Sequence, residues 1–107
     1  MGASKLDIYS NDINQIATAA KVFAHPARVA ILQHISKQES CICSDLVDEI
    51  GLAQPTISQH LKVINTAGLL KGNFEGKSLC YCINLERFQE LQTLFNAFFN
   101  QTKINCC

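Results

Sequence analysis

The sequence predicts a mainly α-helical fold with a small β-hairpin, and the prediction starts from residues 54–67. This stretch has the boundaries of a helix, because Pro55 suits the first helical position and Gly68 suits the residue just past the last turn. Apolar residues recur between these boundaries at helical spacing. A second short helix is expected at 44–50, followed by a tight turn that contains Gly51. The two segments together predict a helix-turn-helix.

A β-hairpin is expected directly downstream. Strand-like residues at 69–74 and 78–83 flank the segment Glu75-Gly76-Lys77, which places a glycine in the turn. A helix-turn-helix over about 44–67 followed by a wing over about 69–84 makes a winged helix-turn-helix of the α+β class.

One face of the predicted second helix is built only from hydrogen-bonding groups without an acid. A merely solvated helix would normally mix Glu with Lys to gain pairs between neighbouring turns. Amide, hydroxyl and imidazole groups with one lysine are instead the groups that reach base edges and phosphates in DNA. The residues of this face are Gln54, Thr56, Ser58, Gln59, His60 and Lys62.

Two further helices are expected to hold a homodimer. Residues 12–23 and 85–102 each carry an apolar stripe, and the second has more apolar surface than one neighbouring helix needs. A two-fold dimer through both helices would cover that surface and would present two reading helices one DNA turn apart. The alternative is a last helix packed wholly within its own subunit. The residues expected in the dimer interface are Ile13, Ile16, Leu91, Leu94, Phe95 and Phe98.

Length and composition fit one domain over residues 1–107. The nine basic and nine acidic residues give zero net charge, which argues against a basic coat that binds any nucleic acid. No apolar run approaches the ~20 residues of a membrane span, and residues 1–10 lack the pattern of a signal peptide. We therefore expect a cytoplasmic chain whose six cysteines are thiols rather than structural disulfides. No catalytic constellation is evident, so an enzyme is not expected.

Several motifs together resemble the ArsR (arsenic-repressor) family of bacterial transcription regulators. The resemblance covers about residues 16–100, and the combination of motifs is specific although each alone is weak. The motifs are His25-Pro26-Ala27-Arg28, Gln54-Pro55-Thr56-Ile57-Ser58-Gln59-His60-Leu61-Lys62, Ala67-Gly68-Leu69-Leu70 and Glu75-Gly76-Lys77.

The resemblance implies a homodimeric, DNA-binding transcriptional repressor whose operator is an imperfect palindrome of double-stranded DNA. Matched to the family's recognition helix, the base-reading residues would be Gln54, Ser58, Gln59 and His60, with phosphates held by Lys62 and the wing-tip Lys77. The chain departs from the family at Ala53, where Ser or Thr is frequent. Alanine is a poor N-cap by roughly 1 kcal/mol, so the start of the helix should be looser.

The histidines do not predict a metal site. His25 precedes a proline and is expected to cap or pack locally, and no histidine lies at ligand spacing from another histidine or a cysteine. Zinc-sensing relatives carry Asp-x-His and His-x-x-Glu/His on the last helix, whereas this chain has Asn84, Glu86, Ala97 and Asn100 at about those places. The resemblance therefore implies no zinc or cobalt site there, and no cofactor is required.

The cysteines form three close pairs, 41/43, 80/82 and 106/107. Arsenic- and cadmium-sensing relatives carry Cys-x-Cys directly before an Asp, but here Ser44 intervenes and shifts the register by one residue. Strand alternation puts Cys80 and Cys82 on one face, where we expect them to pack as small apolar residues. The thiols expected to bind a soft ion such as As(III) or Sb(III) are Cys41 and Cys43 at a helix start, completed by Cys106 or Cys107.

The leading hypothesis is a repressor that leaves its operator when its thiols bind a soft metal or metalloid, or become oxidised. One alternative is a winged-helix regulator without an effector that a protein partner controls. Another is a thiol-based metal-binding protein in which the helix-turn-helix is only a scaffold. The acid-free reading face argues against that last alternative, because a scaffold does not need one.

Overall fold

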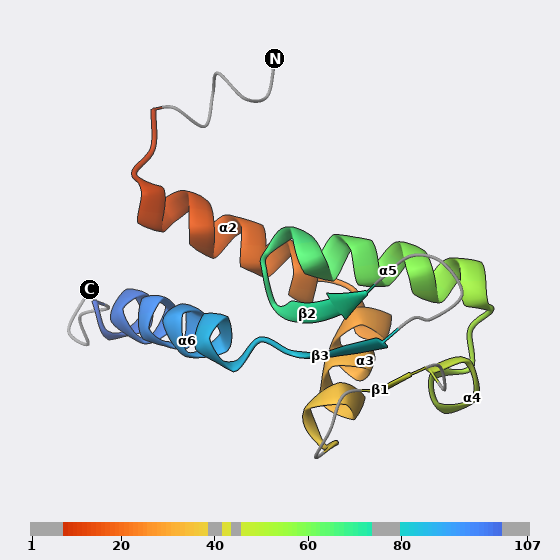
Figure 1. The fold of residues 1–107 in the computed structure, drawn as a ribbon. Helices are drawn as coiled ribbons and strands as arrows, with labels where there is room; N and C mark the ends of the chain where they lie inside the picture. The colour runs from red at the N-terminus through yellow and green to blue at the C-terminus, as the bar shows by residue number, and fades with distance from the viewer. Residues whose placement is uncertain (1–7, 39–41, 44–45, 74–79, 102–107) are drawn as a thin grey trace.

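The computed structural model describes residues 8–38, 42–43, 46–73 and 80–101, and gives only the backbone for Ile42, Cys43 and Asn73. Its helices are α2 (Asn11–Phe23), α3 (Pro26–Ser36), α4 (Leu46–Ile50), α5 (Gln54–Thr66) and α6 (Leu85–Asn100), and its strands are β1 (Ile42–Cys43), β2 (Leu70–Asn73) and β3 (Cys80–Ile83) (Figure 1).

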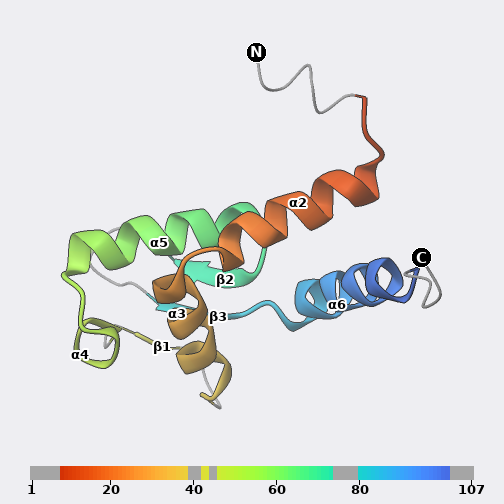
Figure 2. The same ribbon diagram turned by 180° about the vertical axis from the view of Figure 1, so that it is seen from behind.

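The elements form an elongated body of 52 × 34 × 24 Å. Helices α2 and α6 contact each other and extend away from the rest, as the front and back views agree (Figures 1 and 2). Helices α3, α4 and α5 and the small sheet make up the other end of the molecule. The chain is therefore divided into a helix-turn-helix end and a two-helix end.

The predicted mainly α-helical fold with an antiparallel β2–β3 hairpin is confirmed, and the helix-turn-helix appears as α4 and α5. The predicted helix at 44–50 is described only from Leu46, and the last helix ends at Asn100 rather than 102. Lys77 and the rest of the expected hairpin turn lie outside the described residues.

A third strand, β1, was not expected from the sequence. It pairs antiparallel with β3, so that the sheet order is β1-β3-β2 and β3 is central. The register places Ile42 opposite Tyr81 and Cys43 opposite Cys80. A strand of two residues is too short to show alternation, so only pairing with β3 reveals it.

The core confirms the apolar stripe of the recognition helix. Ile57, Leu61 and Ile64 are fully buried, and α5 packs on both α3 and α4 through this stripe. Tyr81 of β3 joins the same core and is 1% exposed. The reading helix is therefore fixed against the body by its apolar face, and its polar face is left outside.

Candidate nucleic-acid interface

The polar face of α5 is accessible, as a reading face must be. The side chains of Gln54, Thr56, Gln59 and Lys62 are exposed, and that of Ser58 is half-buried. Gln54 donates its Nε2 hydrogen to Ser58 Oγ at 3.1 Å, which links these two side chains across one helical turn. The structure thus presents the predicted reading residues together along one helix.

The start of α5 has no side-chain cap. Ala53 occupies the N-cap position with extended backbone, Pro55 lies in the first turn, and no acidic residue is present there. The backbone N–H groups of this first turn therefore have no side-chain acceptor at the cap and no local carboxylate. Such a helix start favours an anion, because its N–H groups and dipole are not neutralised.

His60 has a second role that the sequence pattern did not reveal. Its ring packs edge-on against His25 with centroids 4.5 Å apart, and its Nδ1 lies 3.4 Å from Arg28 Nη1. Because a guanidinium only donates, Nδ1 is the acceptor, and the remaining hydrogen of the neutral ring is assigned to Nε2. The pKa of His60 is lowered by burial first, and then by the charges of His25 and Arg28. The ring therefore favours the neutral form.

The His25-Pro26-Ala27-Arg28 motif joins three helices. His25 Nδ1 accepts a hydrogen bond from the Ala27 backbone N–H at 3.1 Å and caps α3, which confirms the predicted local capping role. Arg28 donates from Nε to the Val22 carbonyl at 2.8 Å and from Nη2 to the Lys21 carbonyl at 2.9 Å. These carbonyls belong to the last turn of α2, so Arg28 caps α2 and reaches α5 through His60.

The C-terminal end of α5 is fastened to α6. Arg87 donates from Nε to the Ala67 carbonyl at 2.9 Å, and Asn84 donates from Nδ2 to the Gly68 carbonyl at 3.0 Å. The Oδ1 atom of Asn84 also accepts from the Arg87 backbone N–H and caps α6. The positive φ of Gly68, +75°, ends the helix as the sequence predicted. The start of α6 therefore holds the C-terminal end of the reading helix.

The wing brings β2 very close to β3. Gly72 has φ +133°, and a Cβ at this position would fall on the backbone of Cys80 and Tyr81. Only glycine permits this approach, because any other residue would force the two strands apart. Lys77, predicted to hold a phosphate, belongs to the segment outside the described residues.

The cysteines differ from the expectation in one respect. Cys80 is joined in a disulfide, so the expectation that all six cysteines are thiols is wrong, and Cys80 does not act only as a small packing residue. Cys82 is half-buried and is not in a disulfide. Cys41, Cys106 and Cys107 lie outside the described residues, and Cys43 is described by its backbone in β1. Among the side chains that are described, no three His, Cys, Asp or Glu gather as metal ligands.

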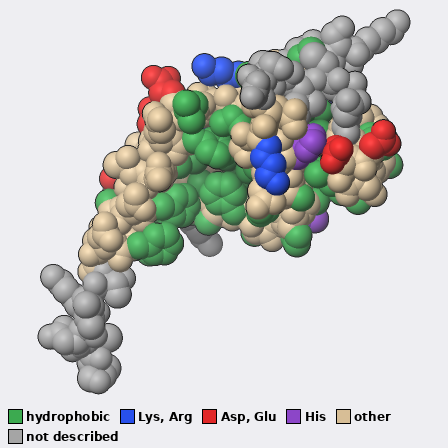
Figure 3. Space-filling model, turned by 90° about the horizontal axis from the view of Figure 1, so that it is seen from below, with side chains coloured by type: hydrophobic (Ala, Val, Ile, Leu, Met, Phe, Trp, Pro, Cys, Tyr) green, Lys and Arg blue, Asp and Glu red, His purple; other side chains and the backbone are tan. Residues whose placement is uncertain are grey.

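The residues predicted for a dimer interface fall into three groups by exposure. Ile13 and Phe98 are 53% and 50% exposed, so both have apolar area left to cover. Leu91 is 3% exposed and belongs to the subunit's own core, while Ile16, Leu94 and Phe95 are half-buried. Phe99, at 62%, is more exposed than any of them. Figure 3 shows hydrophobic side chains along the α6 arm.

Together, these features define a winged helix-turn-helix protein with an accessible polar face on its second helix, which is the architecture of a DNA-binding regulator. No helix in the described part of the chain is long and apolar enough to cross a membrane.

Comparisons with known proteins identify the family. Residues 25–71 match the model of the bacterial regulatory proteins of the arsR family. An uncharacterized HTH-type transcriptional regulator of Methanocaldococcus jannaschii is 38% identical over 72 residues, which is 66% of this chain and 80% of the relative. The arsenical resistance operon repressor of Staphylococcus xylosus is 33% identical over 72 residues, 67% of this chain and 68% of the relative. The crystal structure of the repressor BigR from Xylella fastidiosa matches with a TM-score of 0.57 and 26% identity, over 80% of this chain and 88% of that one.

The chain belongs to the arsR family of bacterial regulatory proteins, as its motifs predicted. It is a DNA-binding transcriptional repressor of this family, not an enzyme.

Proposed function

We propose that the chain works as a homodimer in the cytoplasm, binds an imperfect palindromic operator through residues 54–62, and leaves it when its thiols bind a soft metalloid or are oxidised. The observation that carries the DNA-binding part is the exposed, acid-free face of α5. Amides such as Gln59 bond bidentately to adenine, and hydroxyls reach base edges or phosphates. Lys62 and Lys77 supply charge to phosphates.

The homodimer proposal is supported by the surface shared by α2 and α6. A hollow of about 360 Å³ lies between these helices, with Ile13 and Ile16 on one side and Leu94 and Phe98 on the other. Phe98 and Phe99 lie edge to face with centroids 5.4 Å apart and leave an exposed aromatic ridge beside this hollow. A ridge and a hollow on the same surface are what a two-fold contact needs, since each copy offers both to its partner.

The dimer also explains why α5 is fastened at its middle, through His60, and at its C-terminal end, through α6. A two-fold axis near α6 sets the separation of the two reading helices, which must be one DNA turn, ~34–36 Å, for adjacent half-sites. The hydrogen bonds from Arg87 and Asn84 couple the position of α6 to the end of α5. An event that shifts one helix of this assembly would therefore change operator affinity, which is the requirement for an effector.

The test of the reading face is operator binding by fluorescence anisotropy at fixed salt, with Gln59→Ala against Gln89→Ala. Gln89 is an exposed glutamine on α6 and serves as the matched control. Loss of a bidentate contact should cost about 1–3 kcal/mol on the operator and relax discrimination at one base pair per half-site. Lys77→Ala should weaken binding to all sequences alike and flatten the salt dependence. Unchanged operator affinity for Gln59→Ala would contradict the placement of the reading face.

The effector is tested with the same assay after addition of arsenite, cadmium or a thiol oxidant. Release by any of them that is lost in a chain without cysteines supports the thiol-responsive repressor. A chain that stays on its operator in all three conditions would point to the effector-independent regulator.

A further inference from the structure

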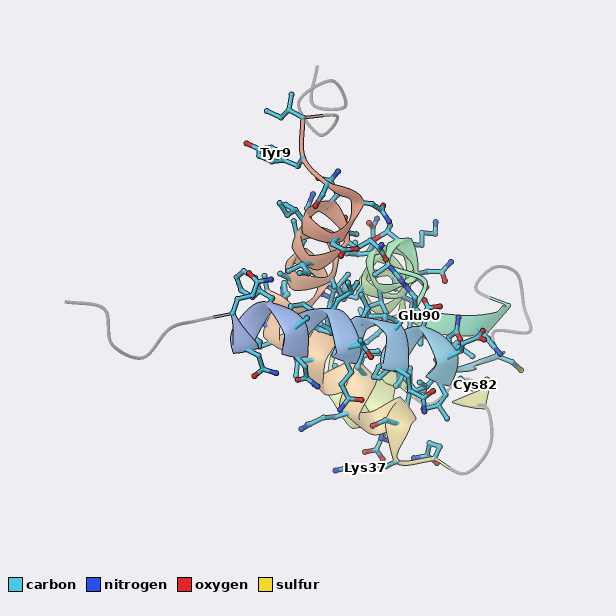
Figure 4. All side chains as sticks on the ribbon, turned by 90° about the vertical axis from the view of Figure 1, so that its left-hand side faces the viewer. Tyr9, Lys37, Cys82 and Glu90 are labelled. Carbon is cyan, nitrogen blue, oxygen red and sulfur yellow. The ribbon has the colours of Figure 1, made fainter. Side chains whose placement is uncertain are left out.

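Two histidine rings and an arginine form a basic cluster where α2, α3 and α5 meet. The rings of His25 and His60 lie edge to face with centroids 4.5 Å apart, and Arg28 Nη1 lies 3.4 Å from His60 Nδ1. The last turn of α2 adds the exposed Lys21, whose carbonyl Arg28 holds. Figure 4 shows side chains of α2 and α5 facing each other where these helices lie side by side.

The charge of this cluster is not neutralised by a described carboxylate. The ion pairs between described residues join Arg87 to Glu90, which is labelled on α6 in Figure 4, and His34 to Glu49. Arg28 is half-buried and uses three of its five N–H donors on two backbone carbonyls and one imidazole. A partly buried guanidinium without an ion pair favours an anion beside it.

Both rings keep the same nitrogen out of internal hydrogen bonds. His25 Nδ1 accepts from the Ala27 backbone N–H and His60 Nδ1 accepts from Arg28, so the hydrogen of each neutral ring is assigned to Nε2. The His25 side chain is exposed. Every buried nitrogen or oxygen of the described side chains has a hydrogen-bond partner, and no described residue bonds His60 Nε2, so that atom is accessible. The cluster therefore offers two N–H donors from adjacent rings.

His60 lies on the flank of the reading helix. Gln59 beside it and Thr56 one turn earlier are exposed, whereas His60 is half-buried against the N-cap residue of α3. A helix with its side chains is ~10–12 Å across and fills a major groove that is ~12 Å wide. The outermost side chains of such a helix reach base edges, and those on its flanks meet the sugar-phosphate backbone.

We propose that His25 and His60 form a binding site for one backbone phosphate of DNA, and that Arg28 is the positioning residue that fixes the His60 ring. The proposal rests on the proposed operator binding through residues 54–62, and it moves His60 from base reading to backbone contact. Hydrogen bonds to phosphate oxygens span ~2.7–3.2 Å, so the oxygens of one phosphate can accept from two rings in contact. Because His25 precedes α3 and His60 lies on α5, this phosphate sets the angle of the reading helix in the groove.

The site also predicts proton uptake when DNA binds. In the free protein, the pKa of His60 is lowered by burial first, and then by the charges of His25 and Arg28. A phosphate beside the rings favours the imidazolium and raises this pKa. Operator affinity should therefore rise as the pH falls from about 8 to about 6, and level off once the free protein is protonated as well.

The first test measures binding by fluorescence anisotropy to an operator selected from a random library and to a duplex of unrelated sequence. His25→Asn keeps a side-chain cap on α3 and His60→Asn keeps an amide at the level of Nδ1, but both lack a group at the level of Nε2. Each should weaken binding to both duplexes about tenfold, because a hydrogen bond to a charged group is lost and phosphates carry no sequence information. His60→Gln, whose amide reaches the level of Nε2, should restore most of the affinity. His34→Gln, near the other end of α3, is the control and should bind like the parent.

The second test locates the phosphate. Methylphosphonate replacement of one phosphate per half-site should weaken binding by the parent, while the double variant His25→Asn/His60→Asn should be insensitive at that position. The double variant should also lose the rise of affinity at low pH. Nitrogen NMR of the parent's histidines should show the hydrogen on Nε2 of both rings, and DNA should shift the signals of His25 and His60 but not of His34. This spectrum decides the proposal even if a variant fails to fold.

Parent-like affinity of His25→Asn and His60→Asn would overturn the site, and so would a loss confined to the operator, since that would make His60 a base contact. Ring signals that DNA does not shift, or that inorganic phosphate shifts equally at the same concentration, would overturn it as well. Gln59→Ala separates the two proposals. Unchanged base discrimination in this variant, with methylphosphonate coupling to the histidines intact, refutes the reading face and supports the phosphate site. Lost discrimination without that coupling refutes the site alone.

Discussion

Arg28→Ala should be the most damaging single change to the junction of α2, α3 and α5. The guanidinium of Arg28 holds two carbonyls of the last turn of α2, those of Val22 and Lys21, at 2.8 and 2.9 Å. It also holds His60 of the reading helix at 3.4 Å. The substitution removes all three contacts and leaves the end of α2 without its side-chain cap.

The magnitude follows from the burial of each contact. A hydrogen bond from a charged donor is worth about 1.5–3 kcal/mol. The bond to Val22 is partly buried and the bond to Lys21 is exposed, so each counts at or below the lower end of that range. The sum is about 2–3 kcal/mol of unfolding free energy. For a domain of this size, that corresponds to a loss of about 10–20 °C in Tm.

Urea and thermal unfolding at a fixed protomer concentration measure this loss, because dimerisation would otherwise shift the apparent stability. Lys62→Ala removes a cation from an exposed position on α5 and should stay within ~0.5 kcal/mol of the parent. Arg28→Lys should recover only part of the loss, because an ammonium cannot reproduce the fork of a guanidinium. A Tm for Arg28→Ala equal to that of Lys62→Ala would refute the capping role.

Three further changes probe the wing, the His60 contact and the dimer. Gly72→Ala should unpair β2 from β3, seen as faster hydrogen exchange of the Asn84 amide, which donates to the Leu69 carbonyl. Gly51→Ala, with φ +84° and no neighbouring atom in the way, should cost only about 1–2 kcal/mol of backbone strain. Equal losses of unfolding free energy in the two variants would contradict the close approach at Gly72. Because the folded-state pKa of His60 is lowered, the unfolded chain binds the proton more readily, so stability should fall as the pH drops below 6.5 and level off below the folded pKa. His60→Gln should lessen this slope, and an identical pH profile would show that the histidine contact carries no energy. Phe98→Asp should give a monomer in analytical ultracentrifugation at micromolar concentration, because it puts an unpaired charge into the proposed interface; Val47→Asp, on an exposed apolar residue of α4, should not, and a dimer in both would place the interface elsewhere.

The sequence alone determined the parts of the molecule that depend on local chemistry. The stripe Ile57, Leu61 and Ile64 has the period of a helix, and Pro55 and Gly68 mark its ends whatever surrounds it. The acid-free face of α5 can also be predicted from the sequence, because helical spacing alone places its residues on one face. The family motifs add the order of helix, turn, helix and wing.

Only the tertiary structure decided which distant residues meet. His25 and His60 are 35 positions apart, and no spacing rule predicts their contact or the bridge that Arg28 makes between α2 and α5. The strand β1 exists only because β3 pairs with it, which puts Cys43 opposite Cys80 and changes the interpretation of the cysteines. Leu91 and Phe98 lie on the same apolar stripe, yet the first is buried in the core and the second is exposed. Periodicity places a residue on a face, but whether its own chain covers that face depends on how the helices pack.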